Sequence, residues 1–168
     1  MNTTPIFRRV ALIGFGLIGG SIARAAREQG LAEEIVTTAR SAKTRARVEE
    51  LGIVDRVVET NAEAAKDADL VILCTPVGAM AEVAAEMAIH LKRGATVSDV
   101  GSVKAAVLEC VGKHLPADVH FIPAHPIAGT EHSGPSAGFA SPFLKTWRNS
   151  STFFEMVPVS LSIPPSCP

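Results

Sequence analysis

A glycine-rich hexapeptide near the start of the chain constrains the fold more than any other feature. It follows a short apolar run and leads into a helical pattern over residues 21–29. Its first glycine permits a tight turn, its second leaves room for a phosphate against the backbone, and its third lets the helix pack closely on the sheet. We expect this segment to bind the pyrophosphate of a dinucleotide at the helix N-terminus, the alternative being a turn that serves packing alone. The predicted binding residues are Gly14, Phe15, Gly16, Leu17, Ile18 and Gly19.

Short β-branched or apolar runs alternate with helical patterns along the rest of the chain. Two helical stripes, over 78–91 and 103–111, each place apolar side chains on one face, and the second includes Val103 and Ala106. Thr60 and Glu63 have the spacing of a helix capping box. Strands that alternate with helices in this way predict a Rossmann-type, doubly wound α/β fold with a mostly parallel sheet. The predicted strands are 9–13, 34–38, 56–58, 69–74, 95–99 and 119–122.

Composition excludes several classes of function. The 168 residues allow one full domain, and 16 Lys+Arg against 17 Asp+Glu give no basic surface for nucleic acid or an acidic membrane. Cys74, Cys110 and Cys167 form no CxxC pair, so we expect no metal site and reduced thiols in a cytoplasmic protein. No signal peptide is recognisable, and no apolar stretch approaches the ~18 residues of a membrane-spanning helix.

The choice between NAD and NADP depends on the end of the second predicted strand. An NAD site normally carries an acidic residue there to hold the ribose 2′-hydroxyl, but this chain has Ala39. Arg40 and Ser41 follow, and they favour NADP or dual use because a guanidinium binds a 2′-phosphate well. The alternative is that Arg40 is a solvated loop cation in a generally basic segment.

Two further strand ends point to the same crevice, because ligands of such sheets bind beyond the carboxyl ends of the strands. Cys74, Thr75 and Pro76 end one strand, and we expect the loop they begin to pass under the cofactor. Gly101 and Ser102 end another. Ser102 is either a helix N-cap or a residue that orients a substrate hydroxyl or the nicotinamide, and spacing alone does not choose.

The loop after the last predicted strand is dense in glycine, proline, histidine and hydroxyl groups. His125 stands at its start, followed by Pro126. A neutral imidazole is well suited to accept a proton near pH 7. The alternative is a hydrogen-bonded loop histidine held extended by the following proline.

Four segments together resemble the prephenate and arogenate (cyclohexadienyl) dehydrogenases of tyrosine biosynthesis. They read GFGLIGGS, LCTPV, SDVGSVK and HPIAGTEHSGPSAGF, and the resemblance runs from about residue 10 to 143. It implies an NAD(P)-binding domain over 1–143 and oxidative decarboxylation of prephenate or arogenate. By the same resemblance His125 contacts the ring hydroxyl, Ser102 is the active-site serine and Glu131 gates the pocket. The family also implies a homodimer.

The remainder of the chain departs from this family. All 13 glycines lie at or before Gly138, and residues 144–168 are rich in serine and proline without helical period. We expect this tail to be disordered or frameshifted, the helical dimerisation domain of the family to be absent, and the activity of a truncated chain to be doubtful. Two other functions stay open: another NAD(P)-dependent reductase or dehydrogenase with a similar βαβ start, and a non-catalytic NAD(P)-binding module.

Overall fold

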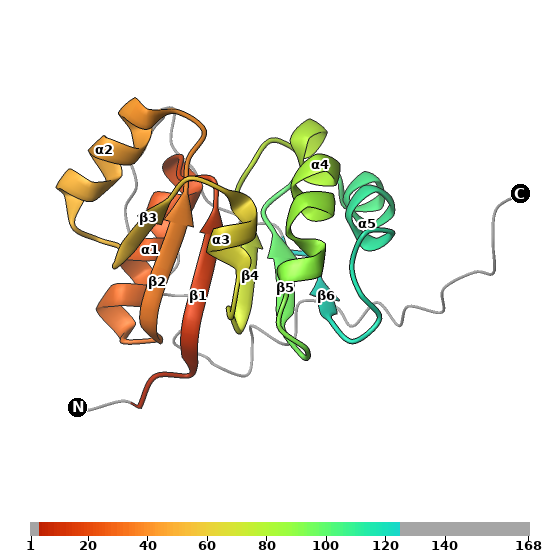
Figure 1. Ribbon diagram of the computed structural model, residues 1–168, viewed down its shortest axis with the longest axis horizontal. Helices are drawn as coiled ribbons and strands as arrows, with labels where there is room; N and C mark the ends of the chain where they lie inside the picture. The colour runs from red at the N-terminus through yellow and green to blue at the C-terminus, as the bar shows by residue number, and fades with distance from the viewer. Residues whose placement is uncertain (1–3, 125–168) are drawn as a thin grey trace, which may run out of the picture.

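Six parallel strands form one sheet in residues 4–124, the part of the chain that the computed structural model describes (Figure 1). The strand order is β3-β2-β1-β4-β5-β6, so the sheet grows outward in both directions from β1. This is the predicted doubly wound arrangement. The strands are β1 (Phe7–Ile13), β2 (Ala32–Thr38), β3 (Arg56–Val58), β4 (Leu70–Leu73), β5 (Thr96–Asp99) and β6 (His120–Ile122).

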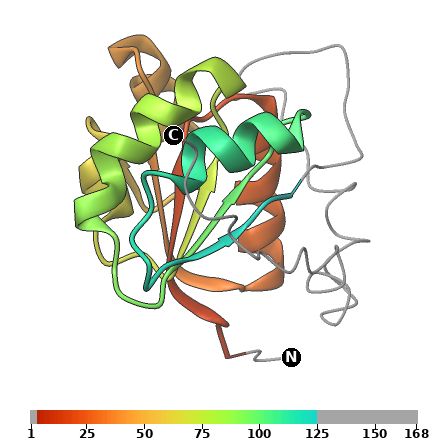
Figure 2. The same ribbon diagram turned by 90° about the vertical axis from the view of Figure 1, so that its right-hand side faces the viewer.

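Helices cover both faces of this sheet, as the view along it shows (Figure 2). One face packs on α1 (Leu17–Gln29) and α2 (Ala42–Leu51). The other packs on α3 (Asn61–Ala65), α4 (Val77–Met87) and α5 (Lys104–Gly112), and a short 3-10 helix, η1 (Ala88–His90), extends α4.

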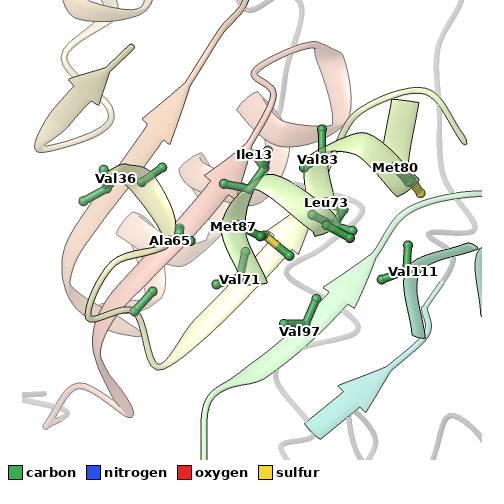
Figure 3. Packing of buried hydrophobic residues seen from close by; sticks show 14 of the residues in the cluster. Ile13, Val36, Ala65, Val71, Leu73, Met80, Val83, Met87, Val97 and Val111 are labelled. Carbon is green, nitrogen blue, oxygen red and sulfur yellow. The ribbon is translucent and has the colours of Figure 1, made fainter. Parts of the chain in front are cut away.

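Alternation along β1 supplies both cores, because successive side chains of a strand point to opposite faces. Ala11 and Ile13 contact the cluster under α4, whereas Val10 and Leu12 contact the cluster under α1. Figure 3 shows the first cluster, in which side chains from α3, α4 and α5 meet those of the central strands. A strand buried on both faces is typical of parallel sheets.

Register brings the carboxyl ends of four strands level with one another. Ile13 is paired with Thr38 on one side and with Leu73 on the other, and Leu73 is paired in turn with Asp99. The segments that follow β1, β2, β4 and β5 therefore start along one edge of the sheet. All predicted site residues that the structure describes lie in these segments.

Some predicted details differ from the structure. The apolar stripe over 78–91 is an α-helix only to Met87, beyond which the chain tightens into η1. Val103 and Ala106, predicted to be in the core, are exposed, Val103 by 54%. The reason is that α5 begins at Lys104, so Val103 precedes the first turn, and only Val107 and Val111 of this helix are buried. The predicted cap of α3 is confirmed on one side, where the Thr60 hydroxyl accepts a hydrogen bond from the Glu63 N–H at 3.1 Å.

Two kinds of feature are absent from residues 4–124. None of the helices there has the length and apolarity needed to cross a bilayer. The same residues contain no group of three or more His, Cys, Asp or Glu side chains placed to hold a metal ion. His125, Glu131, Cys167 and the tail 144–168 lie outside the described residues.

Candidate active site

The glycine turn after β1 has the conformation that its sequence predicts. Gly14 has φ +90°, in the left-handed region that favours glycine, and its N–H donates to the Thr38 carbonyl at 3.1 Å. A Cβ at this position would lie 3.0 Å from Thr75 Cγ2 and 3.2 Å from the Cys74 carbonyl oxygen. The turn is therefore held tightly between the ends of β2 and β4.

The next two glycines have opposite surroundings. A Cβ at Gly19 would lie 2.7 Å from the Gly14 carbonyl oxygen, so only glycine lets α1 approach the turn this closely. A Cβ at Gly16 would have no atom within 4 Å, which leaves open space in front of the helix. Gly16 is the N-cap of α1, has no capping side chain, and is followed by no acidic residue in the first turn. Such a helix end attracts a phosphate through its N–H groups and its dipole.

The apolar side chains of the hexapeptide pack against the protein core. Phe15 is 4% exposed and belongs to the core cluster under α1, and Ile18 packs against the same cluster. A role of Phe15 in cofactor binding therefore belongs to its backbone. Leu17, the first residue of α1, is half-buried.

Cys74 and Thr75, at the end of β4, pack against the glycine turn. Burial, together with the negative charge of Asp99, raises the pKa of the Cys74 thiol to about 12, so it stays protonated and is a packing group rather than a nucleophile. The Thr75 hydroxyl is buried and has no hydrogen-bond partner within residues 4–124. A buried polar atom without a partner is costly, and this one adjoins the turn that the sequence assigns to a dinucleotide. Pro76 caps α4 and is exposed.

Arg40 and Ser41 lie at the end of β2, on the same edge. Ser41 is the N-cap of α2 and accepts a hydrogen bond from the Thr44 N–H at 3.1 Å, so its hydroxyl already has a structural role. Arg45 is paired with Glu59 at 3.2 Å. Arg40 is exposed, and no carboxylate pairs with it in the described part of the chain. Its surroundings are thus compatible with both predicted alternatives, a phosphate ligand and a solvated cation.

A buried carboxylate that sequence reasoning missed organises the neighbouring strand end. Asp99, the last residue of β5, is 0% exposed. It accepts hydrogen bonds from the Gly101 N–H at 2.7 Å, from Lys104 Nζ at 2.6 Å and from the Ala124 N–H at 3.2 Å. Both charged residues lie in the segment SDVGSVK. An acid at the end of a predicted apolar strand, five residues before a lysine, was the signal that could have indicated this ion pair.

The exposed Ser102 follows Gly101, one of the donors to Asp99, in the chain. The structure gives the N-cap position of α5 to Val103 and records no side-chain cap there, so the capping alternative for Ser102 is not supported. Ala124, the last described residue, directly precedes His125.

A cavity of about 400 Å³ lies at the opposite, amino edge of the sheet. Charged residues from the starts of four strands or their preceding loops line it: Arg8, Arg9, Glu33, Glu34, Asp67 and Lys92. Arg9 is paired there with Glu34 at 2.5 Å, and Lys92 with Asp69. None of the predicted site residues lines this cavity.

The family model for the nucleotide-binding domain of prephenate dehydrogenase matches residues 22–147, three-quarters of the chain. The chain belongs to the prephenate dehydrogenase family. It is 42% identical over 138 residues to the cyclohexadienyl dehydrogenase of Zymomonas mobilis, covering 82% of this chain and 47% of that protein. It therefore spans about half the length of this relative.

Solved structures with the same fold include two dehydrogenases of this family. A prephenate dehydrogenase from A. aeolicus, in complex with hydroxyphenyl propionate and NAD+, is similar with a TM-score of 0.69 and 27% identity over 85% of this chain and 49% of that one. The arogenate dehydrogenase of Synechocystis gives a TM-score of 0.70 and 29% identity over 79% of this chain and 45% of that one. Family membership thus agrees with the resemblance that the sequence motifs predicted.

Proposed function

We propose that this chain is the dinucleotide-binding part of an NAD(P)-dependent dehydrogenase that oxidatively decarboxylates prephenate or arogenate in tyrosine biosynthesis, with residues 1–143 as its domain. One observation carries the proposal. In a chain of this family, a single sheet edge holds an open glycine turn, the Thr75 hydroxyl, which has no partner within residues 4–124, and the strand ends that lead to Ser102 and His125. The proposal places the reaction in the cytoplasm, in line with the free thiols of Cys74 and Cys110.

Residues of the glycine turn hold the dinucleotide in this proposal. The N–H groups of the first turn of α1 bind the pyrophosphate, and the Thr75 hydroxyl gains the partner that residues 4–124 do not provide. Gly16 leaves the space needed for the phosphates. When bound, the nicotinamide ring supplies the acceptor for the hydride.

Two side chains near the substrate carry the proton chemistry. His125 accepts the proton of the ring hydroxyl as the hydride leaves the same carbon, and Ser102 orients that hydroxyl. The bond to the ring carboxylate then breaks, and its electron pair moves through the ring onto the new carbonyl oxygen, which takes up a proton. CO2 leaves because the ring becomes aromatic. Glu131 gates the pocket.

The decisive experiment uses the 168-residue chain itself. Calorimetric titrations with NAD+, NADP+, prephenate and arogenate measure each dissociation constant, and the appearance of reduced cofactor measures turnover. We expect His125→Asn to reduce kcat by about 100-fold or more, because general base catalysis contributes about 10²–10⁴-fold, with the dissociation constant of the dinucleotide unchanged. Binding of dinucleotide without turnover of either substrate would favour a non-catalytic module instead.

A second experiment addresses the choice of cofactor. We propose that Arg40 binds the 2′-phosphate and makes the site favour NADP or accept both cofactors. Arg40→Ala should then weaken NADP+ binding by about tenfold, the loss expected for a charge-assisted hydrogen bond, and leave NAD+ binding unchanged. Lys43→Ala, which removes another exposed cation of the same segment, is the matched control. Equal effects of the two variants on NADP+ would mean that Arg40 is only a solvated cation.

A further inference from the structure

The Asp99 carboxylate joins three segments of the chain at the carboxyl edge of the sheet. Its Oδ2 accepts from the Gly101 N–H and from Lys104 Nζ, and its Oδ1 accepts from the Ala124 N–H. A fully buried charge needs such donors, because water no longer solvates it. The donors come from the turn after β5, from the first residue of α5 and from the chain after β6.

Lys104 binds both Asp99 and the backbone of Ala124. Besides its ion pair with Asp99, its ammonium group donates a hydrogen bond to the Ala124 carbonyl oxygen. The Asp99–Lys104 pair therefore binds both backbone polar groups of Ala124. Gly101 is covalently joined to Ser102, and Ala124 to His125, so one ion pair fixes the residue next to each proposed catalytic side chain.

We infer that Asp99 is a positioning residue, whose carboxylate sets the distance between the Ser102 turn and the strand end that carries His125, with Lys104 as its partner. This inference rests on the proposed function for its catalytic consequence. Asp99 is fully buried and acts through its neighbours rather than on substrate. Small errors in the placement of reacting groups are costly, since a displacement of about 1 Å can cost about 100-fold in rate.

The opposite edge of the sheet provides a matched control. Asp69 stands just before β4, and its Oδ2 accepts from the Arg8 N–H at 2.8 Å and the Arg9 N–H at 3.1 Å. Lys92 Nζ donates to its other oxygen. This carboxylate thus has the same set of donors, two backbone N–H groups and one lysine, at the edge that carries none of the predicted site residues.

The test compares Asp99→Asn with Asp69→Asn in the full chain. At position 99 either orientation of the new amide turns its NH2 group toward a backbone N–H, because the two N–H groups donate to different oxygens. At position 69 both N–H groups donate to one oxygen, so the amide can keep them and loses the hydrogen bond from Lys92 instead. The amide oxygen keeps two donors by facing Gly101 and Lys104, so we expect Asp99→Asn to speed amide hydrogen exchange at Ala124 by about 10- to 100-fold, as for loss of a bond to a charged acceptor. We expect kcat to fall by a similar factor, with the KM for dinucleotide within about twofold. Asp69→Asn should also lower Tm, by less because this carboxylate is 23% exposed, and change neither quantity at the site.

Other outcomes separate this inference from the proposed function. Unchanged exchange at Ala124, or unchanged kcat in a chain that turns over substrate, overturns the inference alone. If the wild-type chain turns over neither prephenate nor arogenate, the proposed activity fails and the exchange measurement still decides whether Asp99 fixes Ala124. Should Asp99→Asn not fold, Lys104→Met carries the test, because it removes only the donor to the Ala124 carbonyl and the charge beside Asp99. Lys104→Met with full kcat and unchanged exchange at Ala124 would refute the positioning role.

Discussion

Replacing Gly19 by alanine tests the close packing of α1 on the glycine turn. The added Cβ would lie 2.7 Å from the Gly14 carbonyl oxygen, whereas carbon and oxygen atoms in weak contact stay about 3.3–3.6 Å apart. The helix or the turn must therefore move by roughly 0.6 Å or more. Both are backbone, so the strain cannot be relieved by rotating a side chain.

The magnitude follows from two opposing effects. Overpacking costs about 1–3 kcal/mol, and a rigid backbone obstacle places this site at the upper end. Alanine recovers about 1 kcal/mol in a helix relative to glycine. We expect a net loss of about 2 kcal/mol, which lowers Tm by about 4–8 °C in a chain of this length. The displaced N–H groups should also weaken dinucleotide binding by about tenfold, or about 1.4 kcal/mol.

Two other glycines make the measurement specific. Gly16→Ala meets no atom within 4 Å, so it should lower Tm only by the preference for glycine over alanine at an N-cap. Its methyl group occupies the space proposed for the phosphates and should weaken binding. Gly112→Ala, at the far end of α5 and also without neighbours within 4 Å, should leave the affinity unchanged and should not lower Tm, since alanine favours the helix more than glycine does. Thermal unfolding and calorimetric titration of the three variants provide the assay. A Gly19→Ala variant with unchanged Tm and unchanged affinity would refute the packing argument.

Two further predictions concern ionisation. Burial alone would raise the pKa of Asp69, but the Lys92 ammonium and two backbone N–H groups outweigh it and lower that pKa below 3.8. The contribution of the ionised Asp69 to folding stability is therefore present above about pH 4 and is lost as pH falls through the folded-state pKa. The Tm difference between wild type and Asp69→Asn should accordingly shrink on acidification, and a constant difference would contradict the assigned ion pair. Because burial raises the pKa of Cys74 to about 12, a Cys110→Ser/Cys167→Ser chain should react with a thiol reagent at about pH 8 much more slowly when folded than when unfolded. The folding stability of this variant should also decrease as pH rises above 9.0, the ordinary pKa of a cysteine thiol. Prompt labelling of the native chain would contradict the assigned burial of Cys74.

Sequence periodicity predicted the sheet well because the relevant signals are local. The glycine turn, the alternation along β1 and the cap at Thr60 all depend on residues within a few positions of one another. The direction of each strand followed from the alternation of strands with helices. The Val103 error arose because an apolar stripe was extended across a helix start that the sequence does not mark clearly. Ala106 lies within α5 but is exposed, since only Val107 and Val111 of this helix are buried.

Long-range contacts were beyond this kind of reasoning. Asp99 and Ala124 are 25 positions apart and meet only because β5 and β6 pair in parallel. Ser41 illustrates a different limit, since the same hydroxyl suits a phosphate and a helix N-cap, and only the structure assigns it the cap. His125 and Glu131, outside the described residues, stay predictions.

The buried hydroxyl of Thr75 links the stability of the chain to its ligand. A valine has nearly the same shape, and it removes a polar atom that finds no partner in residues 4–124. Thr75→Val should therefore raise Tm, since an unsatisfied buried group costs about 1–3 kcal/mol, while weakening dinucleotide binding. Selection for thermal stability alone would favour valine at this position, so the threonine marks a point where the fold is less stable than its shape permits. An affinity unchanged by this substitution would show instead that the hydroxyl has no role in binding.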